Sequence, residues 1–307
     1  MSRTTERLRS RPRLVLAAVV ATVVTTVSAV VVVVGCTTRI AAASTSSSTA
    51  AAEALMAGDA PTPLTATDVD TVRILAEVTA AGAAAGGTIS TVALSADGST
   101  LVSNAQADQP RYAASLVKIP LVSRLLALDA AGALTLSPYD LSLMQRAVTS
   151  SSDAAMSALW VRYDGARLVA ETAAALGLTA TAPPAAAGQW GQAWTSASDT
   201  AAVLATLPLA LEADDAATLL GWMRSTTPVA ADGFDQRFGL LAGAADGVAA
   251  KQGWMCCVDD RRQLHSAGVL GDGRVVVLMG DFPAATSWAQ ASAALARAAD
   301  AVRGGIG

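Results

Sequence analysis

The order of helical and strand-like hydrophobic patterns is the feature that most constrains the fold of this chain. A helical spacing of apolar residues over Asp68–Ala85 is followed by two short strand patterns, Thr88–Leu94 and Ser99–Asn104. Three more strand patterns follow only in the last fifth of the chain, over Lys251–Val258, His265–Leu270 and Arg274–Asp281. Strands near both ends of the chain must therefore meet in one sheet, with everything between them inserted.

The inserted middle and the end of the chain have helical patterns. One helix is expected over Ser115–Ala130, and Ser137–Thr227 is mostly helical except for a loop at Ala180–Ala193. A closing helix is expected over Ala284–Val302. This order predicts an α/β (α+β) fold, in which an antiparallel sheet is flanked by N- and C-terminal helices and joined by an all-helical lobe.

The N-terminus has the signals of export. Ser2–Arg13 is basic, and Leu14–Val34 is an unbroken apolar run except for three Thr and one Ser. Gly35-Cys36 follows, and Val33–Cys36 resembles the bacterial lipobox, in which Cys36 is lipidated and becomes the new N-terminus. The run is also long enough to remain as an uncleaved membrane anchor. Both interpretations place the rest of the chain outside the cytoplasmic membrane.

These signals divide the chain into three parts. Residues 1–35 are interpreted as a signal peptide with lipobox, 36–64 as an Ala/Ser/Thr-rich linker, and 65–307 as the folded domain. Beyond residue 35 the chain has 16 basic and 24 acidic residues. Because so acidic a part binds polyphosphates poorly, nucleic acid is not expected as a partner. The sequence thus predicts an extracytoplasmic, membrane-anchored lipoprotein.

The basic residues are divided unevenly between Arg and Lys. Of the 21 basic residues, 19 are Arg and two are Lys, namely Lys118 and Lys251. Only Lys readily loses its proton when buried, so each Lys marks a place to look for chemistry. Lys118 follows Ser115 by three residues, and on a helix its amine can lie close enough to take the hydroxyl proton. Lys251 begins the sequence Lys251-Gln252-Gly253 at the head of a strand, where Gly lets a substrate approach.

Other common catalytic arrangements find little support. His265 is the single His, and no G-x-S-x-G motif exists to supply a Ser for a Ser-His-Asp enzyme. Cys36, Cys256 and Cys257 lack the spacing of a zinc site, so neither a metal nor a cofactor is expected. Side chains of adjacent strand residues point to opposite faces, which favours free or buried thiols at Cys256 and Cys257 over a vicinal disulfide.

Taken together, the motifs resemble those of the class A β-lactamases and related penicillin-binding serine enzymes, which carry S-x-x-K, S-D-N and K-T-G. The first motif is Ser115–Lys118, the second is Ser152-Asp153-Ala154, and the third is Lys251–Gly253 in altered form. The resemblance extends over about Thr65–Gly307. It implies the β-lactamase/transpeptidase fold, which agrees with the order of elements.

The resemblance also implies roles for individual residues. Ser115 is expected to be the nucleophile and Lys118 its proton acceptor or relay. Ser152 is expected to be the second hydroxyl, which passes a proton to the leaving nitrogen. Lys251 is expected to be the electrostatic partner of Ser152 and of a substrate carboxylate. Backbone N–H groups of Ser115 and Trp254 would form the oxyanion hole.

Further substrate-binding residues are expected around the third motif. Gln252 and Gly253 belong to the motif itself. Arg261 and His265 lie near the strand turn where related enzymes place a carboxylate-binding Arg, although a solvated turn is the simpler interpretation.

The chain also departs from the family pattern. Ala154 replaces Asn in the second motif, and Gln252 replaces Thr in the third. The loop Leu178–Ser198 contains no Asp or Glu that could activate a deacylating water, so hydrolysis of an acyl-enzyme should be slow. Trp190 and Trp194 in that loop either line a cleft or pack in the core.

The sequence therefore predicts an exported serine acyl hydrolase or transferase of the β-lactamase type. Its expected partners are a β-lactam or a D-Ala-D-Ala-like peptide of the peptidoglycan stem, and the membrane through a lipid or signal anchor; we expect a monomer. The alternative is a non-catalytic, envelope-binding lipoprotein on the same scaffold. Ala154 and Gln252 favour that alternative, whereas the set of Ser and Lys residues argues against it.

Overall fold

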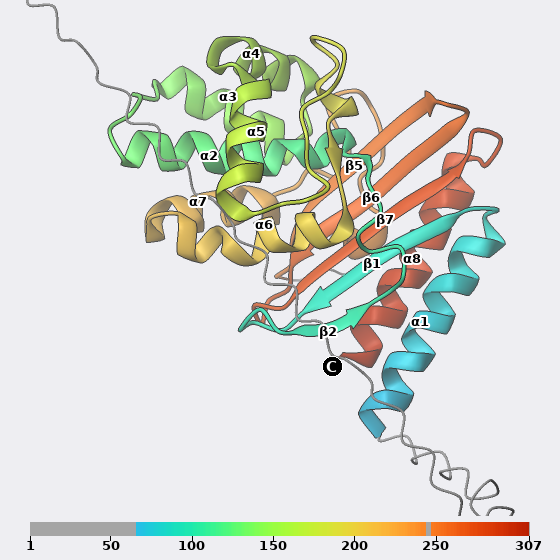
Figure 1. Cartoon of the computed structure of the whole chain (residues 1–307). Helices are drawn as coiled ribbons and strands as arrows, with labels where there is room; N and C mark the ends of the chain where they lie inside the picture. Colours follow the sequence, from blue (N-terminus) through green and yellow to red (C-terminus); the bar gives the residue numbers. More distant parts are fainter. Residues whose placement is uncertain (1–65, 244–246, 307) are drawn as a thin grey trace, which may run out of the picture. The chain divides into compact units, whose positions relative to one another are not determined.

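The computed structural model describes residues 66–243 and 247–306 (Figure 1). The predicted signal peptide, the lipobox with Cys36 and the linker 36–64 lie outside the described residues. Among the helices of the described residues, none is long and apolar enough to cross a membrane.

A five-stranded antiparallel sheet forms the centre of the domain. Its strands lie in the spatial order β2-β1-β7-β6-β5. Their bounds are β1 (Thr88–Leu94), β2 (Thr100–Ser103), β5 (Ala249–Val258), β6 (Arg261–Val269) and β7 (Val275–Pro283). The N-terminal strand pair joins the C-terminal trio through β1 and β7, whose register runs from Thr88 opposite Asp281 to Leu94 opposite Val275. The predicted meeting of both chain ends in one sheet is thus confirmed, and β5 becomes an edge strand.

The sheet is buried on both faces, as the apolar run in β7 shows. Val275, Val277 and Met279 belong to one hydrophobic cluster. The intervening Val276 and Leu278 belong to another cluster on the opposite face. Because successive strand residues point to opposite faces, a continuous apolar run requires a covering layer on each side.

Helices α1 (Ala66–Ala84) and α8 (Trp288–Gly305) contact each other and cover one face (Figure 1). The closing helix begins later than its apolar pattern suggests. Ser287 and Gln290 form a capping box, in which each side chain accepts a hydrogen bond from the backbone N–H of the other residue. This cap fixes the helix start at Trp288.

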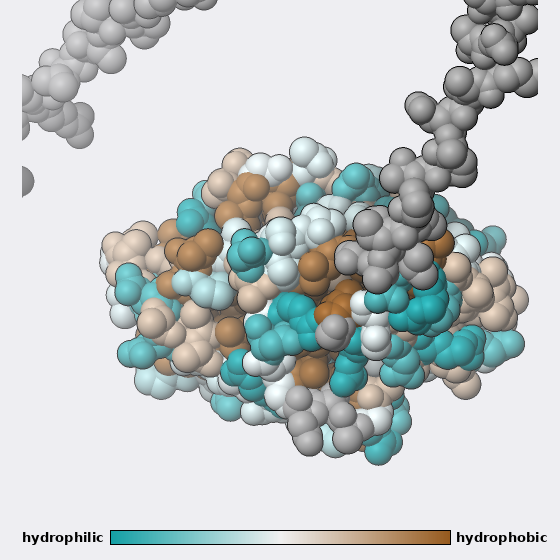
Figure 2. Space-filling view, turned by 90° about the horizontal axis from the view of Figure 1, so that it is seen from below, coloured by the Kyte–Doolittle hydropathy of each residue, from teal (hydrophilic) through white to brown (hydrophobic). Residues whose placement is uncertain are grey.

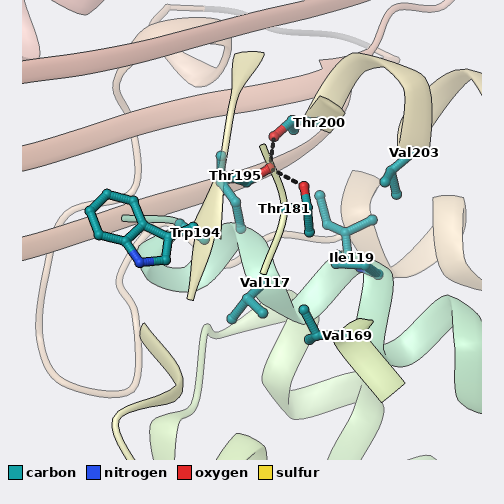
Figure 3. Close-up of a pocket in the computed structure, with 11 residues that line it drawn as sticks. Val117, Ile119, Val169, Thr181, Trp194, Thr195, Thr200 and Val203 are labelled. Carbon is teal, nitrogen blue, oxygen red and sulfur yellow. Dashed lines mark hydrogen bonds between the residues drawn. The ribbon is translucent and has the colours of Figure 1, made fainter. Parts of the chain in front are cut away.

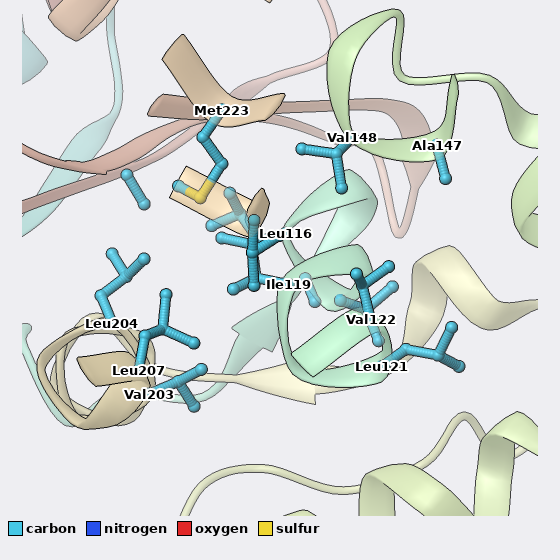
Figure 4. Packing of buried hydrophobic residues seen from close by; sticks show 14 of the residues in the cluster. Leu116, Ile119, Leu121, Val122, Ala147, Val148, Val203, Leu204, Leu207 and Met223 are labelled. Carbon is cyan, nitrogen blue, oxygen red and sulfur yellow. The ribbon is translucent and has the colours of Figure 1, made fainter. Parts of the chain in front are cut away.

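The all-helical lobe covers the other face. It consists of α2 (Lys118–Ala130), α3 (Pro138–Thr149), α4 (Asp153–Tyr163), α5 (Gly165–Leu176), α6 (Ala197–Ala210) and α7 (Ala213–Arg224). In the centre of the lobe, apolar side chains of α2, α3, α6 and α7 pack together (Figure 4). Leu121, Val122, Leu204 and Met223 are almost fully buried there. The lobe and the sheet therefore share one core, which holds the start of α2 in place.

The expectation of free thiols in β5 is wrong. The structure joins Cys256 and Cys257 in a disulfide across a cis peptide bond. The pairing of β5 with β6 shifts register between Met255 and Val258, so the regular alternation of side chains does not hold at these two residues.

The surface seen from below mixes apolar and hydrophilic residues (Figure 2). Large exposed apolar side chains of the domain, such as Val161 and Leu209, come from different helices of the lobe. Scattered apolar residues of this kind are normal on a protein surface.

Candidate active site

Ser115 lies in a short 3-10 turn, η1 (Ala114–Val117), which leads directly into α2. Side chains three residues apart eclipse one another in a 3-10 turn. Ser115 Oγ and Lys118 Nζ therefore lie 2.8 Å apart, as the S-x-x-K spacing predicts. Lys118 is fully buried and Ser115 is nearly so.

The backbone is strained next to each of two site hydroxyls. Ala114, immediately before Ser115, has φ of 46°, and Ser151 has φ of 52°. Non-glycine residues avoid this left-handed region, and such residues gather at functional sites, where the surrounding structure holds them. Both hydroxyls are thus held in position by the fold.

The second hydroxyl of the site belongs to Ser151, which corrects the expectation for Ser152. Ser151 Oγ lies 3.1 Å from Lys118 Nζ and 2.8 Å from Lys251 Nζ. Ser152 instead caps α4, and its Oγ accepts a hydrogen bond from the Ala155 N–H at 3.3 Å. A helix N-cap directs its side chain back to its own helix, so Ser152 cannot face the two Lys residues.

The second motif therefore reads Ser151-Ser152-Asp153, and its third residue is Asp153 rather than Ala154. Asp153 Oδ1 lies 2.8 Å from Lys118 Nζ. The roles expected from the sequence did not include one for Asp153. The signal that could have found it is the run Ser150–Ser152, which allows the motif to start one residue earlier.

Lys118 Nζ is surrounded by acceptors. Besides the two hydroxyls and Asp153, it donates to the Ser151 carbonyl oxygen at 2.7 Å. Burial lowers the pKa of Lys118 from 10.5 to about 8, against the opposing effect of the Asp153 carboxylate. At this pKa the amine can exchange a proton with Ser115 near neutral pH.

Lys251 lies on the face of β5 that is turned toward Ser151. Its Nζ donates to Ser151 Oγ and, at 2.7 Å, to the Gln252 carbonyl oxygen. Burial and the nearby charge of Lys118 lower the pKa of Lys251 well below its usual value. Two buried amines thus share one hydroxyl, in a place where water does not shield their charges from each other.

Gly253 brings β5 against the turn that carries Ser115. A Cβ atom at this position would lie 3.3 Å from the Ser115 backbone nitrogen and 3.4 Å from the Ala113 carbonyl oxygen. Since few real Cβ contacts are so close, Gly253 permits this approach of the edge strand. The structure thus gives Gly253 a contact with the turn, and the substrate contact expected for it stays a prediction.

Gln252 points away from the groove, contrary to the expectation that it binds substrate. It is fully buried, and its Nε2 donates to the Gln236 and Phe238 carbonyl oxygens. Trp254 also directs its indole to that side, where it stacks on Phe234 with ring centroids 4.6 Å apart. Strand alternation explains both orientations, because Lys251 and Gly253 occupy the opposite face.

Neither Arg261 nor His265 forms a hydrogen bond or ion pair with the hydroxyls and amines of the site. Arg261 forms an ion pair with Asp281 at 3.0 Å. His265 is fully buried, and its Nε2 lies 2.9 Å from the Tyr112 carbonyl oxygen. Burial lowers the pKa of His265 to about 4, so it is neutral at ordinary pH. Burial of His265 rules out the direct substrate contact expected for it, whereas for Arg261 that role stays a prediction.

The loop between α5 and α6 covers Lys118 with an indole. Trp190 begins the turn η2 (Trp190–Gln192), and its ring centroid lies 4.8 Å from Lys118 Nζ. The indole Nε1 donates to Ser157 Oγ at 3.1 Å. A cation over an aromatic face is attracted to it, so Trp190 favours the charged form of Lys118 without offering a base.

Asp199 is the carboxylate nearest this loop in sequence, and it is fully engaged in holding the loop. Its oxygens accept hydrogen bonds from Thr179 N, Ala180 N and Thr181 Oγ. It is buried at the start of α6. Asp199 is therefore an anchor of the loop and is not available to a water at Ser115.

A small, mostly apolar cavity lies behind the Ser115 turn (Figure 3). Thr195 Oγ1 lies 3.2 Å from both Thr181 Oγ1 and Thr200 Oγ1 at one side of it. Trp194, in β4 (Trp194–Thr195), lies at its edge and stacks on Tyr112 of β3 (Arg111–Tyr112), with ring centroids 4.3 Å apart. Of the two loop Trp residues, Trp194 is thus the packing residue.

Ser115 opens onto a separate groove between the lobe and β5. Its walls include Ser115, Asp153, Trp190, Trp254 and Met255. One carboxylate, Asp153, lines this groove in the described part of the chain. The groove is the place where a ligand could reach the nucleophile.

Comparison with known proteins gives one set of sequence relatives. No family model matches the chain. It is 35% identical over 207 residues to "Putative lipoprotein LppW" of Mycobacterium tuberculosis, and the same protein of Mycobacterium bovis matches equally. The match covers 66% of this chain and 65% of those proteins, so the chain spans about two thirds of their length.

Solved structures are similar at the level of the fold. A β-lactamase from Chitinophaga pinensis has a TM-score of 0.64 at 19% identity, over 76% of this chain and 99% of that one. A mutant of PBP-A, solved as an acyl-enzyme complex with penicillin G, has a TM-score of 0.61 at 18% identity, over 77% and 96% of the two chains. The described domain of this chain therefore has the fold that class A β-lactamases and penicillin-binding proteins share.

Proposed function

We propose that this chain is an exported serine acyl-transfer protein of the penicillin-binding type, acting on β-lactams or D-Ala-D-Ala-like peptides. The observation that carries the proposal is the unbroken chain of short contacts from Ser115 Oγ through Lys118 Nζ and Ser151 Oγ to Lys251 Nζ. Export is supported by the lipobox at Cys36 and by the name of the mycobacterial relatives.

Acylation begins at Ser115. Its Oγ attacks the carbonyl carbon of the ligand while the hydroxyl proton moves to neutral Lys118 Nζ, 2.8 Å away. With a pKa of about 8, roughly a tenth of Lys118 is neutral at pH 7. The backbone N–H groups of Ser115 and Trp254 are our candidates for the donors that stabilise the developing oxyanion, since Gly253 packs β5 against the Ser115 turn.

The C–N bond of the ligand then breaks, and the leaving nitrogen needs a proton. Ser151 Oγ supplies it and is reprotonated from Lys118, 3.1 Å away. Lys251 Nζ, 2.8 Å from Ser151 Oγ, donates a hydrogen bond that stabilises that oxygen while its proton is in transit. The products of this step are an ester on Ser115 and a free amine on the ligand, and Lys118 is neutral again.

Deacylation is expected to be slow. It requires a water activated by a base. Trp190 occupies the loop side of Lys118, and Asp153, the carboxylate of the groove, is ion-paired with Lys118. Asp199 is already held by three donors of the loop. Loss of a general base costs about 10²–10⁴-fold in rate, so an acyl adduct should persist.

A non-catalytic binding role is the second candidate. The observation that favours it is Asp153, whose carboxylate forms an ion pair with Lys118 and opposes loss of its proton. In that case the groove would bind an envelope ligand without forming an ester.

Labelling with a fluorescent penicillin distinguishes the two candidates. We expect the full-length chain to acquire a covalent label that survives denaturation, with a half-life of minutes or longer, because acylation is supported and deacylation is not. Intact-mass analysis should show one adduct. Ser115→Ala should remove the label, and Ser152→Ala should retain it, since Ser152 caps α4.

The labelling result decides between the candidates directly. A chain that stays unlabelled by several β-lactams of different classes, while folded, would overturn the acyl-transfer proposal in favour of the binding role. Loss of label in Ser152→Ala but not in a Ser151→Ala variant would contradict the assignment of the second hydroxyl.

A further inference from the structure

Asp153 is linked to Ser115 through a single side chain, that of Lys118. Its Oδ1 contacts Lys118 Nζ at 2.8 Å, and the same Nζ contacts Ser115 Oγ at 2.8 Å. Asp153 and Ser115 also line the same groove. A ligand whose carbonyl carbon meets Ser115 must therefore place its neighbouring atoms close to this carboxylate.

The Asp153 side chain is open to a ligand. It is 63% exposed, and no described residue forms a hydrogen bond to its Oδ2. Asp153 is the first residue of α4, the end of a helix that attracts negative charge. An ionised carboxylate only accepts hydrogen bonds, so it attracts N–H donors and repels carbonyl oxygens.

The acylation step strengthens this preference. Lys118 must be neutral when it takes the Ser115 proton, and at that moment Asp153 loses the positive charge that balances it. A ligand amine next to the reacting carbonyl can donate N–H hydrogen bonds to the carboxylate, and an ammonium there also replaces the lost charge, whereas an amide carbonyl oxygen there adds repulsion. The other side chains that line the groove, such as Ser157 and Gln189, are neutral.

From this arrangement we propose that Asp153 makes the groove select acyl donors with a free amino group beside the reacting carbonyl over donors in which that nitrogen is acylated. Asp153 acts here as a specificity-determining residue. The inference rests on the proposed function, because selectivity is read from acylation of Ser115.

Two penicillins that differ only at this nitrogen test the inference. 6-Aminopenicillanic acid carries a free amine beside the β-lactam carbonyl, and benzylpenicillin carries an amide there. Acylation rates of the full-length chain are measured by intact mass, and the ratio of the two rates is compared between the natural chain and Asp153→Asn. An Asn side chain donates to a carbonyl oxygen, so we expect the ratio to shift at least about tenfold toward benzylpenicillin.

The control has the same substitution at the other end of the same helix. Asp164 caps the start of α5 in a left-handed conformation that Asn also adopts, so Asp164→Asn should leave the ratio unchanged. A pH profile separates selectivity from a general effect on Lys118. Without the carboxylate that raises the Lys118 pKa, the profiles of both penicillins should move to lower pH by the same amount.

Each outcome has one meaning. A ratio that is the same in the natural chain and Asp153→Asn overturns the inference while leaving the acyl-transfer function intact. Absence of an adduct with both penicillins in all variants overturns the proposed function, and the inference with it. A shifted ratio in Asp153→Asn, with no shift in Asp164→Asn, supports the inference.

Discussion

At the scale of residues, the site depends on two buried Lys side chains that share the hydroxyl of Ser151. Burial lowers the pKa of both, and for Lys118 the Asp153 carboxylate limits that decrease. In the proposed acylation, the protonation state of Lys118 would therefore control whether Ser115 can lose its proton.

This control predicts a pH dependence of acylation. Lys118 must be neutral to accept the proton, and its pKa is lowered from 10.5 to about 8. The rate of penicillin acylation should therefore rise with pH from 6, reach half its maximum near pH 8, and then level off. Intact-mass analysis of samples quenched at set times, at fixed ionic strength, measures this profile.

Lys118→Arg is the control for that profile. Arg keeps its proton throughout this range, so the variant should acylate at least about 10²-fold more slowly at every pH. A natural chain whose rate is flat between pH 6 and pH 9 would show that Lys118 is not the proton acceptor.

The sequence identified most members of the site but misplaced one of them. Ser115, Lys118 and Lys251 could be located because few residues of their type compete for the motif. Ser150, Ser151 and Ser152 are alike in sequence, and only the left-handed backbone at Ser151 and the cap formed by Ser152 distinguish them. A one-residue ambiguity of this kind is resolved by tertiary structure.

At the scale of elements, alternation along β5 decides which residues reach the groove. Lys251 and Gly253 face the lobe, whereas Gln252 and Trp254 face the layer of α1 and α8. The sequence motif alone does not reveal this division, because the partners of Gln252 are carbonyl groups of Gln236 and Phe238, 16 and 14 residues earlier and outside the motif. The strand pattern was predictable, but the residues that satisfy its buried polar groups were not.

The close contact of β5 with the Ser115 turn gives a second prediction. In Gly253→Ala, the new Cβ would lie 3.3 Å from the Ser115 nitrogen and must push the strand and the turn apart by a few tenths of an ångström. Because small misplacements in a catalytic site are costly, we expect acylation to slow by about 10- to 100-fold. Two quantities are measured for each variant: the acylation rate and the midpoint of urea unfolding.

Gly221→Ala is the matched control. Gly221 lies in α7, where an added Cβ meets nothing within 4 Å. The substitution should raise the free energy of unfolding by about 0.5–1 kcal/mol and leave acylation unchanged. Equal acylation rates in Gly253→Ala and the natural chain would contradict a role for this close approach.

At the scale of the whole molecule, the sheet is held by cores on both faces and by buried polar groups between them. The order of hydrophobic patterns was sufficient to predict this architecture, since a sheet with both faces apolar needs a helical layer on each side. The polar contacts that cross between layers, such as His265 with Tyr112, join distant segments and leave no pattern in the sequence.

His265 gives a prediction for the stability of the domain. Its pKa is lowered to about 4 in the folded chain, against 6.5 when it is exposed, so the unfolded chain binds the proton more tightly. The stabilisation is present above pH 6.5 and is lost as the pH falls through 4. Between pH 7 and pH 5, the free energy of unfolding should fall by about 2 kcal/mol because of this residue.

Urea unfolding at the two pH values measures this loss. His265→Gln does not titrate in this range, so its decrease between pH 7 and pH 5 should be about 2 kcal/mol smaller than that of the natural chain. Equal decreases in the two chains would show that His265 does not cause acid lability.

The direction of α1 has a consequence for what the groove can reach. The first residues of α1 lie at one end of the domain, and the edge of β5 beside α4 lies at the other (Figure 1). With 19 residues, α1 itself is about 28 Å long. The chain that precedes Ala66 therefore joins the domain at the end opposite the groove, so a ligand can enter the groove without passing that junction.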